Sequence, residues 1–164
     1  MESLIVAVAQ YLIFPILLGA AVIWLLLSRQ DKVGLAVQGI VALFVAFVLI
    51  KLAAASYVDP RPFVVNPLVK PLFAHPADNG FPSDHTAVAS TVALLVMMYR
   101  RWLGVALLAG SLLVGVARVA AHVHHAQDIA AGALIAVVAV GIAAAVWAWA
   151  QPRLPRRLAS MAAA

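Results

Sequence analysis

Long apolar stretches, each free of Asp, Glu, Lys and Arg, cover most of this chain of 164 residues. A helix that crosses a bilayer needs about 20 apolar residues, since its backbone polar groups can bond only within the segment. Five such stretches predict transmembrane helices at approximately 3–28, 33–56, 84–99, 102–119 and 127–150. The first stretch has no basic region before it and is too long for the core of a signal peptide, so we expect an uncleaved helix. The predicted fold is an all-α, polytopic membrane helix bundle that forms a single domain over residues 1–164.

The third and fourth stretches are short for a full crossing, with 14 residues at 86–99 and 16 residues at 102–117. Their helices must therefore include polar residues at their ends, and these are Asp84, His85 and Arg118. Ionisable groups drawn toward the membrane interior are costly and by default mark a functional site.

The composition agrees with a membrane protein, since 66% of the residues are hydrophobic, 10% are charged and the mean hydropathy is +1.06. The net charge of +5 does not indicate a nucleic-acid partner, because the 11 Lys and Arg residues are scattered between apolar runs. The chain has no cysteine, which excludes disulfides, thiolate zinc sites and cysteine nucleophiles. Catalysis would have to use His, Asp, Ser, Lys or Arg.

Five spans would divide the charged residues unevenly between the two sides of the membrane. One side receives seven of the 11 basic residues, and by the positive-inside rule it is cytoplasmic, together with the C-terminus. The N-terminus and the connecting segments 58–83 and 119–127 then lie outside, with all five histidines and five of the six acidic residues. This segregation predicts a single external site. The seven basic residues are Arg29, Lys32, Arg100, Arg101, Arg153, Arg156 and Arg157.

The densest group of reactive residues extends from Arg118 to Asp128. His124 and Asp128 are four residues apart, so on a helical turn they share a face, and Asp128 can accept the proton of one ring nitrogen. The other nitrogen is then free to attack an electrophile. The guanidinium of Arg118 matches phosphate oxygens. A hydrogen-bonded pair at the membrane interface is the alternative interpretation, and the neighbours His122 and His125 are interpreted as interfacial polar residues or reserve proton carriers.

A second group, Ser83-Asp84-His85, lies where a loop becomes the third helix. Simple helix capping by Ser83 or Asp84 would explain it. The N-terminus of a helix also binds anions, so capping and phosphate binding are compatible. His85 is placed to act as a general acid toward a leaving group.

Arg61 forms a third candidate site, just after the second helix, between Pro60 and Pro62. The two prolines stiffen the backbone and hold the guanidinium in position. The alternative role is an anchor to lipid headgroups.

These clusters, in this order, resemble the type 2 phosphatidic acid phosphatase superfamily, whose pattern is Lys-x6-Arg-Pro, Pro-Ser-Gly-His and Ser-Arg-x5-His-x3-Asp. The resemblance runs from roughly Lys51 to Asp128. The first motif ends in Arg61-Pro62, the second is Pro82-Ser83-Asp84-His85, and the third supplies Arg118, His124 and Asp128.

Within this superfamily the chain looks most like the undecaprenyl-diphosphatases of the bacitracin-resistance type. The likeness lies in the segments 59–63, 75–78 and 81–86, including Asp84 in place of the glycine of the second motif. Other positions depart from the pattern. Ala117 replaces the serine of the third motif, and Ala54 stands where the first motif has its lysine. Lys51, about one helical turn earlier, is the expected substitute, with Lys70 as the other candidate. Five predicted helices are also one fewer than the six usual in such phosphatases.

The resemblance implies an integral membrane lipid phosphatase with no metal or other cofactor, whose substrate is undecaprenyl pyrophosphate. Its phosphate would bind Arg61, Ser83 and Arg118, with Lys51 and Asp84 also at the site. His124 would attack phosphorus with the help of Asp128 and form a phosphohistidine, and His85 would protonate the leaving group. The implied location is the bacterial cytoplasmic membrane, with the active site on the periplasmic or extracellular side.

Other functions stay open. The substrate could be another lipid phosphate, such as phosphatidylglycerol phosphate, phosphatidic acid or lipid A. A metal hydrolase could draw ligands from His75, Asp78, His122, His124, His125 and Asp128, although the nearby arginines would repel a cation. A small proton-coupled transporter would be expected to carry polar residues along its helix midpoints, whereas here they gather at one end. The sequence does not define the oligomeric state.

Overall fold

The computed structural model describes residues 1–153, and within this range the regular structure is helical. The long helices are α1 (Glu2–Tyr11), α2 (Ile13–Leu26), α3 (Arg29–Ser56), α5 (Asp84–Tyr99), α6 (Arg101–Ala120) and α7 (Ala126–Ala150). Two short elements, α4 (Pro62–Val65) and the 3-10 helix η1 (Gln151–Arg153), complete the list. The all-α prediction is confirmed. Arg156, Arg157 and the alanine-rich end of the chain lie outside the described residues.

The first predicted span is divided into α1 and α2, which meet at an angle of 44°. Pro15, in the first turn of α2, explains the break. Proline has no N–H to donate, and its ring collides with the carbonyl four residues earlier, here that of Tyr11. The other four predicted helices correspond closely to α3, α5, α6 and α7.

Within the described residues, α3, α6 and α7 are long and apolar enough to cross a membrane, and the bent α1–α2 pair together satisfies the same test. Helix α5 is shorter, with 16 residues. The chain is therefore a multi-pass membrane helix bundle, while the count of five spans and the orientation in the membrane stay predictions.

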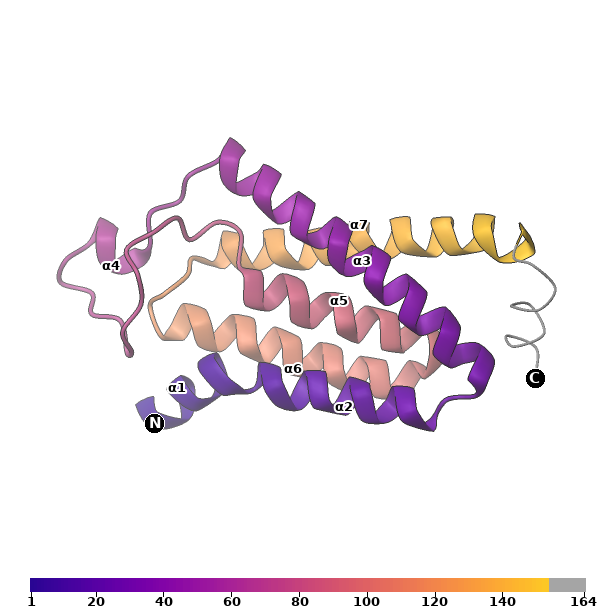
Figure 1. Ribbon diagram of the computed structural model, residues 1–164. Helices are drawn as coiled ribbons and strands as arrows, with labels where there is room; N and C mark the ends of the chain where they lie inside the picture. Colours follow the sequence, from indigo (N-terminus) through magenta and orange to yellow (C-terminus); the bar gives the residue numbers. More distant parts are fainter. Residues whose placement is uncertain (154–164) are drawn as a thin grey trace.

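Helix α5 occupies the centre of the bundle and contacts α2, α3, α6 and α7 (Figure 1). Small residues make this close packing possible. A Cβ atom on Gly104 would lie 2.2 Å from the Met97 backbone, and one on Gly132 would lie 2.7 Å from the Ser83 carbonyl oxygen. Gly104 thus allows the tight α5–α6 turn, and Gly132 allows α7 to approach the N-terminus of α5.

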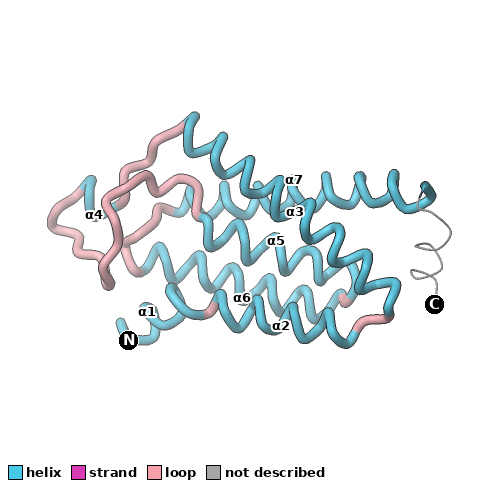
Figure 2. Tube along the Cα trace, viewed as in Figure 1, coloured by secondary structure: helices cyan, strands magenta, loops and turns pink. Residues whose placement is uncertain are grey.

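The two ends of the bundle differ. The long connection that contains α4 gathers at one end, beside the N-terminus of the chain, while the described loops at the other end are short turns (Figure 2). Because 16 helical residues extend only about 24 Å, α5 begins deeper than the adjacent end of α6 (Figure 1). The recess above α5 is covered by the long connection.

Candidate active site

A cavity of about 330 Å³ occupies this recess. It is lined by side chains from α3, the long connection, α5, α6 and the segment between α6 and α7. Among these residues are six of the eight predicted site residues, namely Lys51, Arg61, Asp84, His85, Arg118 and His124. Asp128 is buried beside His124, and Ser83 is not among the lining residues.

His124 and Asp128 form the predicted pair. His124 Nδ1 lies 3.1 Å from Asp128 Oδ2, and both side chains are buried. Asp128 lies in the first turn of α7, where the same oxygen accepts the backbone N–H of His125 at 2.9 Å. The helix start therefore fixes the carboxylate, and the carboxylate fixes the imidazole.

Arg61 indicates which tautomer His124 adopts. Arg61 Nη1 lies 3.4 Å from His124 Nε2. Because a guanidinium can only donate, Nε2 must be the accepting nitrogen, and Nδ1 must carry the proton given to Asp128. Nε2 therefore keeps an unprotonated lone pair, which here accepts the Arg61 N–H and could attack an electrophile once that donor turns to a bound anion.

Electrostatics favour the neutral form of His124. Burial lowers the pKa of His124 below its ordinary value of 6.5, and the charges of Arg118 and Arg61 lower it further, against the opposing effect of Asp128. A neutral imidazole keeps the lone pair that nucleophilic attack requires.

Arg61 and Arg118 are the buried cations of the cavity, with exposed fractions of 5% and 3%. Arg61 Nη1 donates to the Val123 carbonyl at 2.6 Å, which ties the long connection to the segment that carries His124. Arg118 Nη1 donates to the Ala9 carbonyl of α1 at 3.2 Å. Both guanidinium groups are thus positioned before any anion binds, which favours phosphate recognition.

The N-terminus of α5 forms the floor of the site. Ser83 is the N-cap, and its hydroxyl accepts the Thr86 N–H at 3.4 Å. The capping interpretation of Ser83 is therefore confirmed, while its contact with phosphate stays a prediction. Asp84 and His85 occupy the first turn and both line the cavity.

Three further polar residues contact the residues of this region, although the sequence predicted no role for them in phosphate chemistry. Asp78 Oδ1 accepts Arg61 Nε at 2.8 Å. His75 Nε2 lies 3.1 Å from Arg118 Nη2, and its ring lies edge-on to the His124 ring at 6.4 Å between centroids. Asp59 is buried and pairs with His125. Sequence spacing does not show such contacts, because they join distant positions within the long connection or join it to α6 and the start of α7.

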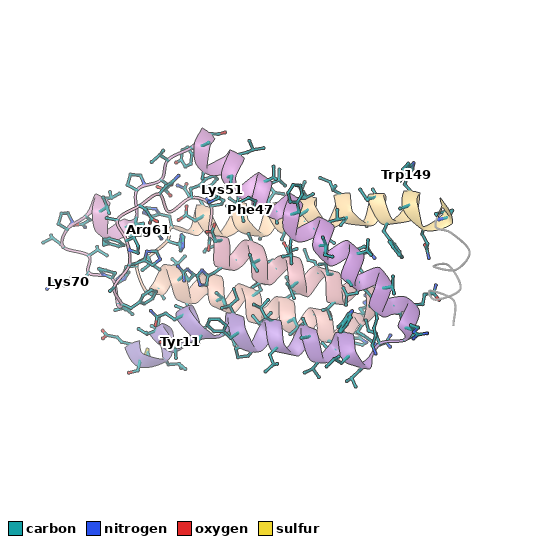
Figure 3. All side chains as sticks on the ribbon, in the orientation of Figure 1. Tyr11, Phe47, Lys51, Arg61, Lys70 and Trp149 are labelled. Atoms are coloured by element: carbon teal, nitrogen blue, oxygen red, sulfur yellow. The ribbon has the colours of Figure 1, made fainter. Side chains whose placement is uncertain are left out.

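The two candidate lysines lie in different places (Figure 3). Lys51, near the end of α3, lines the cavity. Lys70 lies at the outer edge of the long connection, away from Arg61 (Figure 3). Its carbonyl lies 3.0 Å from Nδ1 of His122, an exposed residue. The geometry therefore favours Lys51 as the substitute for the motif lysine.

A possible metal-ligand group lies behind the cavity. Ligand atoms of Asp59, His125 and Asp128 lie within 4.8 Å of one another. Most of these atoms already have partners, since His125 Nδ1 lies 2.9 Å from Asp59 Oδ2, and Gln127 Nε2 donates to the same oxygen at 2.6 Å. The group forms a hydrogen-bonded chain that holds the start of α7.

Comparison with known proteins places this geometry in a family. The sequence model of the PAP2 superfamily matches residues 33–153 of this chain. The chain is 32% identical over 130 residues to the bacitracin transport permease protein BcrC of Bacillus licheniformis, covering 79% of this chain and 64% of that protein. It is 30% identical over 138 residues to the undecaprenyl-diphosphatase BcrC of Bacillus subtilis (strain 168), covering 84% of this chain and 70% of that protein.

Two further matches extend the comparison. The putative undecaprenyl-diphosphatase YbjG of Escherichia coli (strain K12) is 32% identical over 164 residues, covering 98% of this chain and 80% of that protein. The crystal structure of Aquifex aeolicus LpxE has the same fold, with a TM-score of 0.71 and 23% identity over 87% of this chain and 84% of that chain. This chain belongs to the PAP2 superfamily.

Proposed function

We propose that this protein is a membrane lipid phosphatase that dephosphorylates undecaprenyl pyrophosphate through a phosphohistidine intermediate. One observation carries the proposal: His124 is held by Asp128 with its unprotonated nitrogen beside Arg61, in a cavity that also contains Arg118 and His85. The names of the Bacillus subtilis and Escherichia coli relatives support the choice of substrate.

In the first step the terminal phosphate lies between Arg61 and Arg118. His124 Nε2 attacks phosphorus, the bond to the bridging oxygen breaks, and His85 donates a proton to the departing lipid monophosphate. The phosphorylated imidazole carries a positive charge that Asp128 stabilises across 3.1 Å. The two arginines balance the negative charge that develops on the phosphoryl oxygens.

In the second step a water attacks the phosphohistidine while His85 accepts its proton, so that orthophosphate leaves and His124 returns to its neutral form. Each group in this cycle is a protein side chain, and we therefore propose that no metal is needed. The site would face the periplasmic or extracellular side of the bacterial cytoplasmic membrane, where the polar end of the bundle reaches a lipid headgroup.

The decisive experiment measures phosphate release from undecaprenyl pyrophosphate by the purified protein in detergent with excess chelator. We expect activity that chelation does not change and that is lost in His124→Ala. His122→Asn is the matched control, because His122 is exposed and has a positive φ of 61°, which Asn tolerates. An acid-labile, alkali-stable phosphoprotein should accumulate on rapid quenching of the wild type.

The other outcomes favour other functions. Activity that a chelator abolishes would favour a metal hydrolase at Asp59, His125 and Asp128. Faster turnover of phosphatidic acid, phosphatidylglycerol phosphate or a lipid A phosphate would replace the proposed substrate. Absence of phosphate release from every lipid in this panel would overturn the phosphatase proposal and leave the transporter hypothesis.

A further inference from the structure

Both buried arginines of the cavity are paired with residues from one short loop segment, 75–78. His75 Nε2 lies 3.1 Å from Arg118 Nη2, and Asp78 Oδ1 lies 2.8 Å from Arg61 Nε. These are the two guanidinium groups expected to hold phosphate. The segment therefore occupies donors that a substrate would need.

The two partners of the Arg61–Asp78 ion pair are held very differently. The side chain of Arg61 is 6% exposed, whereas that of Asp78 is 61% exposed. Arg61 is also fixed by its bond to the Val123 carbonyl. When an anion competes for Arg61, Asp78 is therefore the partner that can move into water at little cost, while the guanidinium stays in place.

The Asp78 carboxylate resembles a phosphate in its negative charge and in the hydrogen bonds that it accepts. Both are oxyanions that accept paired N–H donors from arginine. The hydrogen bond and charge of Arg61 outweigh the opposing effect of burial and hold the pKa of Asp78 below its ordinary value of 3.8. Asp78 is therefore ionised at neutral pH and competes with anions for Arg61.

We propose that Asp78 is a built-in competitor of phosphate: its carboxylate occupies the phosphate position at Arg61 and must be displaced by any phosphate that binds there. The cost of displacing it is the same for a pyrophosphate and for a monophosphate. Asp78 therefore lowers the affinity of the site for substrate and products alike. This inference rests on the proposed function.

The same competition acts on the products. Hydrolysis of a lipid pyrophosphate gives a lipid monophosphate and orthophosphate. As each product leaves, the carboxylate returns to Arg61. Asp78 thus disfavours product rebinding.

The test compares wild type with Asp78→Asn, which keeps the shape of the side chain and removes its charge. We expect the inhibition constant of orthophosphate to fall about three- to tenfold, the range expected for losing one partly exposed competing ion pair. KM for undecaprenyl pyrophosphate should fall by a similar factor, because the substrate must displace the same carboxylate. Asp78→Glu should retain the wild-type inhibition constant because it keeps the carboxylate. Glu2→Gln removes one exposed negative charge elsewhere and is the control for net charge.

Two results would overturn the inference. One is an unchanged inhibition constant of orthophosphate in Asp78→Asn. The other is a loss of kcat without tighter orthophosphate binding, which would indicate a role in chemistry or in loop structure. If the wild type releases phosphate from no lipid, the proposed function fails separately. The competition is then tested by orthophosphate binding alone, which should still be tighter in Asp78→Asn.

Discussion

Replacing Asp128 with asparagine tests the central pair of the site. The amide has nearly the same shape as the carboxylate and retains an oxygen that can accept the His125 N–H, at present bonded at 2.9 Å. The start of α7 should therefore stay folded. What changes is the charge that faces His124 Nδ1 across 3.1 Å.

The structure sets limits on the expected loss of activity. Phosphorylated His124 is cationic, and two unit charges 3.1 Å apart attract by about 5 kcal/mol at an effective dielectric constant of about 20. Losing all of this would slow the reaction by nearly 10⁴-fold. If the amide oxygen still accepts the Nδ1 proton, only the extra strength of a charge-assisted bond is lost, about 1–1.5 kcal/mol or roughly tenfold. If the amide turns its NH2 toward Nδ1 instead, His124 must move its proton to Nε2 and loses its nucleophilic lone pair.

We therefore expect kcat for phosphate release by Asp128→Asn to fall by between about tenfold and 10⁴-fold. KM should change less, because Asp128 is not among the residues that line the cavity. Asp31→Asn, at the opposite end of the bundle, is the control for removing a carboxylate in the first turn of a helix. A variant with a kcat within about threefold of wild type and equal thermal stability would refute the assignment of Asp128 as the partner of His124.

Three further predictions concern pH, packing and the choice of lysine. Because the pKa of His124 is lowered from 6.5 and its neutral form is the proposed nucleophile, kcat/KM should stay constant as pH falls through 6.5 and decline only below it. A decline that begins above pH 6.5 would contradict this. Gly132→Ala should destabilise the fold by about 1–3 kcal/mol in thermal unfolding, since its Cβ would lie 2.7 Å from a backbone oxygen. Gly141→Ala on the same helix meets nothing within 4 Å and should be neutral or up to about 1 kcal/mol more stable, and equal losses in both variants would exclude the packing explanation. Lys51→Ala should raise KM several-fold while Lys70→Ala leaves it unchanged, and the reverse order would identify Lys70 as the phosphate ligand.

The sequence predicted the helices well because their signal is local. Four of the five long stretches without charge became single helices, and the polar residues at the start of the third predicted helix lie at the start of α5. The bend between α1 and α2 was missed because the stretch stays apolar across Pro15 and only the backbone is interrupted. Apolar composition predicts a membrane span, but it does not show where the backbone hydrogen bonds of the helix are interrupted.

The pairing of His124 with Asp128 was predicted correctly, but not its geometry. His124 lies before the N-cap His125 and not on a helical turn, and Asp128 in the first turn of α7 reaches back to it. Contacts between motifs were not predictable. The pairing of Asp78 with Arg61 joins residues 17 positions apart within a loop that has no periodic pattern. The choice between Lys51 and Lys70 likewise depends on the path of that loop.

Asp59 shows how the separate motifs become one site. Its backbone N–H donates to Asn79 Oδ1 at 3.0 Å, and its carbonyl accepts the Gly80 N–H at 2.9 Å. Its carboxylate lies 2.9 Å from His125 Nδ1. One buried residue thus joins the segment of Arg61 to the approach to α5 and to the start of α7, three of the places from which the proposed site residues extend. The helices set the depth of the site, and contacts between loops set the distances on which the chemistry depends.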